Sequence, residues 1–134
     1  MRSVNAYRRA HVESAPPSRL LDEMYTYLEG DLRAATECIE KKDIAGKARA
    51  CDRALAILGD LEAALDHNAA PELCQNLASL YRFSSDRILD ASLRLDPKPI
   101  AEAQKVLAPV IDAFRIAGGI MLFLIALEMV FGKP

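Results

Sequence analysis

Four segments of this chain carry apolar residues at spacings of three and four, and short polar or proline-containing stretches separate them. This spacing places apolar side chains on one face of an α-helix, whereas a half-buried strand would show strict alternation. The predicted helices cover about residues 17–41, 44–65, 71–95 and 99–115. Because each helix has one apolar face to bury, we expect an all-α fold in which helix packs against helix.

The breaks between these segments predict where the helices begin and end. Pro17 and Pro71 stand where a first helical turn lacks partners for its N–H groups, and Asp43 is placed to cap the second helix. The stretch 96–99 is expected to be a loop, because its two prolines remove two backbone donors. Connections this short make consecutive helices antiparallel, so the sequence predicts an up-and-down four-helix bundle.

One proline falls inside a predicted helix. Pro109 lies within the apolar stripe of the last segment, and it is expected to kink or interrupt that helix at a cost of about 3 kcal/mol. At 134 residues the chain has room for one domain with a real core. We therefore expect a single helical-bundle domain over 1–134, with a core bundle at 16–115 and an apolar C-terminal extension at 116–134.

Net charge and cysteine content indicate which binding partners and which cellular compartment to expect. A formal net charge of −2 gives no broad attraction to phosphate backbones or anionic membranes, so nucleic acid is not an expected partner. The three cysteines are an odd number without a C-x-x-C pair, which predicts neither a disulfide framework nor a zinc site. No apolar stretch follows the basic residues near the N-terminus, as a secretory signal would require. These features favour a reducing cytoplasm.

Residues that carry enzyme or metal chemistry do not cluster along the sequence. His11 and His67 stand apart, and no Glu-x-x-His occurs, so the di-iron ligands of ferritin-like bundles are missing. Cys51 and Cys74 lie on apolar stripes and are expected to be small core residues. Phosphate-binding glycine loops and nucleophile elbows are also absent from the sequence. We therefore expect no enzyme activity, no cofactor and no metal.

Several short sequences follow one another at family-like spacings along the predicted helices. They are VNAY at 4–7, VESAPP at 12–17 followed by two leucines, DRALAILGDL at 52–61, NLASLYRF at 76–83, and the last helix from 102 to 115. The stretch at 76–83 matches most closely, as N-L-x-x-L-Y-x-[YF]. Together these sequences resemble the FliS family of flagellin-specific export chaperones over about residues 4–115.

This resemblance implies a function in flagellar protein export. A family member is expected to be a cytoplasmic chaperone that binds the disordered C-terminal segment of flagellin and prevents its premature polymerisation. It is further expected to help deliver flagellin to a gate component of the flagellar type III export apparatus. Flagellin termini pair through apolar stripes, so masking those stripes on a helical surface would suppress assembly.

Two sets of residues are candidates for binding such a partner. The resemblance suggests that Val4 and Tyr7 belong to a short N-terminal cap over the bundle, although a frayed terminus with Tyr7 simply packed is the alternative. A client groove is a further hypothesis, with one wall on the second helix and the other on the third. Its residues would be Leu55, Ile57, Leu61, Leu77 and Tyr81, all of which would otherwise be ordinary core positions.

The apolar run from Ile116 to Phe131 does not belong to the resemblance described above. It resembles a membrane segment of the MarC family, but about 16 helical residues reach only about 24 Å, short of a bilayer core near 30 Å. Glu128 also interrupts the run, so membrane insertion is not favoured. The alternatives are an extension of the last helix, burial against the bundle, joining of two chains, or a gene-fusion remnant.

This extension supports two further hypotheses. It could occupy the client groove in the absence of flagellin, because both the tail and the second helix carry surplus apolar surface. Alternatively, it could organise a membrane-associated or oligomeric helical protein, which is the competing functional interpretation of the whole chain.

Overall fold

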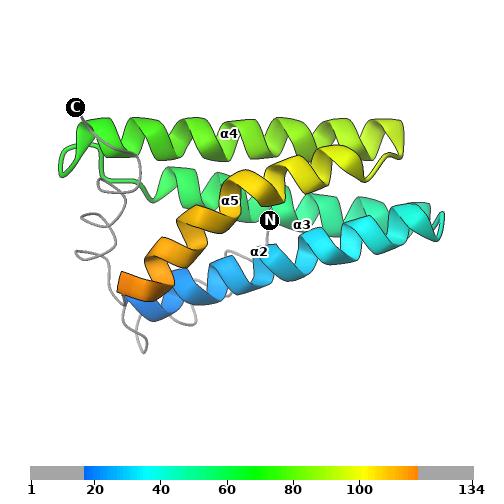
Figure 1. The fold of residues 1–134 in the computed structure, drawn as a ribbon, viewed down its shortest axis with the longest axis horizontal. Coiled ribbons are helices and arrows are strands. Elements are labelled where there is room, and N and C mark those ends of the chain that lie inside the picture. Colours follow the sequence, from blue (N-terminus) through cyan, green and yellow to red (C-terminus); the bar gives the residue numbers. More distant parts are fainter. Residues whose placement is uncertain (1–16, 118–134) are drawn as a thin grey trace.

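The computed structural model describes residues 17–117 as an antiparallel four-helix bundle (Figure 1). Its helices are α2 (Pro17–Glu40), α3 (Ile44–Ala63), α4 (Pro71–Arg94) and α5 (Lys98–Ala117). Each begins and ends within a few residues of the predicted segment. The all-α, up-and-down bundle is therefore confirmed, whereas the N-terminal cap and most of the apolar extension lie outside the described residues.

The four apolar stripes converge on one core. At its centre the Tyr25 and Tyr81 hydroxyls form a buried hydrogen bond of 2.8 Å between α2 and α4. The Phe114 ring on α5 meets the Tyr25 ring edge to face, with 5.7 Å between centroids. These three aromatic residues tie three helices together. The largest fully buried side chains around them are Leu28, Leu32, Leu58, Leu73, Leu77, Ile88, Ile100, Leu107 and Val110.

The connection between α2 and α3 is tight and well capped. Asp43 Oδ1 accepts a hydrogen bond of 3.0 Å from the Gly46 N–H, which confirms the predicted N-cap. Lys42, at a φ of 62°, provides the left-handed turn residue. Gly46 is buried where the helix ends meet, and a Cβ there would lie 2.7 Å from Cys38 Sγ. Only glycine fits this close approach without movement of its neighbours.

Pro109 does not interrupt α5, which continues as one helix to Ala117. Figure 1 shows instead that the axis bends, so that the first half follows α4 and the second half crosses toward the start of α2. Pro109 and Lys105 are both exposed, so the Lys105 carbonyl that loses its helical donor is at the surface, where water can satisfy it. The helix therefore tolerates the proline by bending.

Ion pairs join every neighbouring pair of helices. Such exposed pairs contribute modestly, about 0.2–1 kcal/mol each, and mainly fix the relative position of the helices. They are Arg53–Asp31 between α3 and α2, Arg82–Glu62 between α4 and α3, Arg87–Glu102 between α4 and α5, and Arg115–Asp22 between α5 and α2.

Candidate functional site

The predicted client-groove residues lie mainly inside the bundle. Ile57, Leu61, Leu77 and Tyr81 are at most 3% exposed and belong to one core cluster, while Leu55 is half-buried and packs against that cluster. The structure thus brings all five toward the same core but presents only Leu55 partly to solvent. Their client-binding role stays a prediction.

Tyr81 has a defined structural role in addition to that prediction. Its hydroxyl is paired with Tyr25, and burial raises the pKa of Tyr81 to about 12. Burial likewise raises the pKa of Tyr25 well above its usual value. Both hydroxyls are therefore neutral at physiological pH and join α2 to α4. Val4 and Tyr7, the predicted cap residues, lie outside the described residues.

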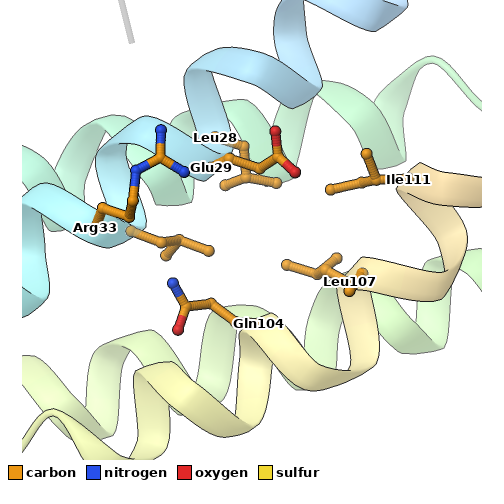
Figure 2. Close-up of a pocket in the computed structure, with 8 residues that line it drawn as sticks. Leu28, Glu29, Arg33, Gln104, Leu107 and Ile111 are labelled. Atoms are coloured by element: carbon orange, nitrogen blue, oxygen red, sulfur yellow. The ribbon is translucent and has the colours of Figure 1, made fainter. Parts of the chain in front are cut away.

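An open apolar groove lies between α2 and α5, the two helices that close the bundle (Figure 2). It encloses a cavity of about 150 Å³. Leu28, Leu107 and Ile111 point into it in Figure 2. The floor is formed by Leu28, Leu32, Leu107 and Ile111, each at most 2% exposed, and the rim by Glu29, Arg33, Gln104 and Ala108. A cavity of this volume can hold a group the size of a benzene ring.

The path of α5 explains why the groove opens here. The first half of α5 packs along α4, and α5 makes less contact with α2 than with α4. The α5 residues at the rim are Gln104 and Ala108, and the short side chain of Ala108 does not bridge the gap to α2. The sequence feature that accompanies this opening is an alanine next to Pro109 in the last helix, and both residues are exposed.

The groove rim carries charges of both signs. Arg115 donates to Asp22 at 2.9 Å and to Glu29 at 3.1 Å, and these contacts, Asp22 first, raise the pKa of Arg115. This pairing joins the end of α5 to α2. Arg33, by contrast, makes no ion pair with any other residue between 17 and 117. An acidic group on a bound segment would therefore find an available cation at the rim.

A second apolar surface lies on the outside of α4. Leu89 and Leu93 are neighbours on the helix at positions i and i+4, and Leu93 is 82% exposed. Phe83 and Leu95 are also about half exposed. Unlike the groove, this surface has no enclosed shape to select a particular partner.

The arrangement of side chains in the described part of the chain decides whether they could hold a metal ion. Across residues 17–117, no group of three or more His, Cys, Asp or Glu side chains could hold a metal ion. Cys51 and Cys74 are buried, as predicted, and burial raises the pKa of both thiols, which disfavours the reactive thiolate. The same residues include no helix long and apolar enough to cross a membrane.

Comparison with known proteins gives one extensive match and one short match. The family model described as flagellar protein FliS matches residues 1–119. A model of the MarC family of integral membrane proteins matches only residues 105–134, so its overlap with the bundle is confined to residues 105–117 of α5.

Individual relatives agree with the extensive match. The flagellar secretion chaperone FliS of Salmonella typhimurium is 30% identical over 117 residues, covering 84% of this chain and 87% of the relative. The protein of the same name from Escherichia coli is 30% identical, with 85% and 88% covered. The flagellar secretion chaperone FliSB of Pseudomonas aeruginosa is 27% identical, with 82% and 90% covered. Together with the four-helix architecture, these matches show that the chain belongs to the FliS family.

Proposed function

We propose that this chain is a cytosolic flagellar export chaperone that binds the disordered C-terminal segment of flagellin. Bound in this way, flagellin would be kept from polymerising and would be presented to a gate component of the export apparatus. No turnover of the client is involved. Support comes from membership of the FliS family and from relatives that are named flagellar secretion chaperones.

The observation that carries the proposal is the open apolar groove between α2 and α5. Its floor is made of Leu28, Leu32, Leu107 and Ile111, and three of its four rim residues are polar. An amphipathic client helix places apolar anchors at i, i+3, i+4 and i+7, and such a row suits a groove with an apolar floor. The polar rim would remain in contact with solvent and with the polar face of the client.

The energetics of a disordered client also suit an export chaperone. A segment that orders on binding loses conformational entropy, which offsets part of the contact energy and keeps the affinity moderate. The client can then be released at the gate without dismantling the bundle. The tyrosine pair and the ion pairs between helices keep the bundle itself in place.

A charge placed at the groove mouth tests this proposal. Ala108 is an exposed rim residue, so Ala108→Glu puts a carboxylate over the apolar floor without altering the core. We expect at least a tenfold loss of affinity for a flagellin C-terminal peptide, measured by isothermal titration calorimetry. That loss corresponds to about 1.4 kcal/mol.

The matched control is Ala48→Glu, an exposed alanine on α3, the helix diagonal to α5 in the bundle. It adds the same charge without approaching the groove and should leave the affinity unchanged. Equal affinities for both variants and the unmodified chain would contradict the assignment of the groove as the binding site.

A further inference from the structure

We propose that residues 118–134 of this chain fold back into the α2–α5 groove and compete there with the client. This inference rests on the proposed function insofar as the groove is taken as the client site. The occupant is thus a segment of the same chain, and flagellin would have to displace it to bind.

The chain leaves the bundle next to the groove. Helix α5 forms one wall of the groove and ends at Ala117, and Arg115 fastens that end of α5 to Asp22 on α2. Gly118 and Gly119 follow directly. Glycine adopts the left-handed conformation that commonly ends a helix and reverses the chain, so this sequence favours a return along α5.

The segment is long enough to cover the groove. The α5 residues of the groove run from Gln104 to Ile111, so the far end is 13 residues from Ala117, or about 20 Å along the helix. The 17 residues from 118 to 134 reach about 25 Å even as a helix, and further if extended. A returning segment therefore spans the whole groove.

The chemistry of the segment matches the groove floor better than the other end of the chain does. Residues 120–127 are all apolar, and 129–131 are apolar again. Residues 1–16 precede the start of α2, which lies beside the end of α5, but they include three arginines and no run of more than two apolar residues. The floor side chains are at most 2% exposed, so the apolar surface that docking removes from water is mainly that of the segment itself, and this favours the more apolar C-terminal segment.

Charge complementarity provides an independent indication. Glu128 is the only carboxylate side chain after Asp112, and Arg33 at the groove rim has no ion pair within residues 17–117. In a helical return beginning near 120, Glu128 comes opposite about residue 109 of α5, level with the middle of the groove. An arginine side chain at the rim can reach a carboxylate at that level.

Thiol labelling in the full-length chain tests this docking without flagellin. A Cys38→Ala background leaves only the buried Cys51 and Cys74 as native thiols. In this background Ala108→Cys places a reporter at the groove rim. We expect the tail variant Leu124→Asp/Leu127→Asp to label at least tenfold faster with a maleimide than the chain with its native tail. A second reporter, Ala48→Cys on α3, should label at the same rate with the native tail and with the altered tail. If Cys51 and Cys74 stay unreactive, the fold is intact.

Equal rates at position 108 with native and altered tails would overturn the proposal. Protection that survives the tail substitutions but is lost on Tyr7→Asp would also overturn it, because the N-terminal segment would then be the occupant. A second experiment exchanges the charges of Arg33 and Glu128. Arg33→Glu and Glu128→Arg should each speed labelling, and their combination should restore protection, whereas additive increases would contradict the docked register.

This experiment separates the inference from the proposed function. Tail-dependent protection in a chain that ignores flagellin would support docking and remove the client assignment. If both proposals hold, the Leu124→Asp/Leu127→Asp variant should also bind a flagellin C-terminal peptide more tightly than the native chain. Faster labelling without any gain in client affinity would contradict competition at the groove.

Discussion

Replacing Gly46 by alanine should destabilise the protein, although the same change normally stabilises a helix. Alanine in place of glycine usually gains about 0.5–1 kcal/mol in a helix interior. At Gly46, however, the added Cβ would lie 2.7 Å from Cys38 Sγ and closer still to the Asp43 carboxylate. Asp43 would have to move, and the N-cap that it provides contributes about 0.5–2 kcal/mol.

The change in stability has two opposing parts. Loss of the Asp43 cap and crowding of the Cys38 thiol destabilise the protein, whereas the higher helix propensity of alanine stabilises it slightly. We expect Gly46→Ala to lower the free energy of unfolding by about 1–2 kcal/mol in urea titrations followed by circular dichroism. Gly59→Ala is the matched control, because nothing lies within 4 Å of the added Cβ, and it should stabilise by about 0.5–1 kcal/mol. In an Asp43→Ala background the penalty of Gly46→Ala should shrink. Equal stabilisation by both glycine substitutions would refute the described packing of the α2–α3 junction.

Three further predictions concern the core and the bundle ends. Ser84→Ala should leave the urea midpoint unchanged or raise it, because no residue between 17 and 117 forms a hydrogen bond with the buried Ser84 hydroxyl, and a lower midpoint would reveal a partner. The tyrosine pair should make stability fall at alkaline pH. The pKa of Tyr81 is raised from 10 to about 12, and that of Tyr25 is raised as well. The stability contributed by neutral Tyr81 is therefore complete below pH 10 and is lost as the pH rises toward 12, by up to about 1.4 kcal/mol per pH unit. Tyr81→Phe should flatten this decline in thermal melts, and an unchanged slope would contradict its origin. Arg115→Gln should cost about 0.5–1 kcal/mol by loss of the ion pair with Asp22, a deficit that shrinks at about 1 M salt if it is electrostatic.

The helices could be predicted from sequence because their signals are local. Apolar spacing within each segment, Pro71 at a first turn and Asp43 as a cap depend on neighbouring residues alone, and the structure confirms them. The sequence did not decide whether Pro109 bends or interrupts the helix, because either change relieves the clash of its ring with the preceding helical turn. The structure shows bending, at a position where water can reach the freed carbonyl.

The position of the groove could not be predicted in the same way. A stripe identifies which side chains a helix buries, but it does not specify which pair of helices packs loosely. The predicted groove residues on α3 and α4, such as Ile57 and Leu77, pack in the core, and their client-binding role stays a prediction. Leu28 and Leu107 are buried to the same degree, and they line a cavity of about 150 Å³ between α2 and α5. Where the bundle opens depends on how α5 divides its packing between α4 and α2, which is a property of the whole bundle. The structure does not describe residues beyond 117. The apolar extension and its role in joining two chains therefore stay predictions.

We propose that this chain holds the C-terminal segment of flagellin in the α2–α5 groove. The most direct measurement is a calorimetric titration of the full-length chain with intact flagellin monomer and with flagellin lacking that segment. We expect saturable binding of intact flagellin that disappears when its C-terminal segment is deleted and weakens at least tenfold for the Ala108→Glu variant of the chaperone. Equal binding of both flagellin forms, or no binding of either under native conditions, would contradict it.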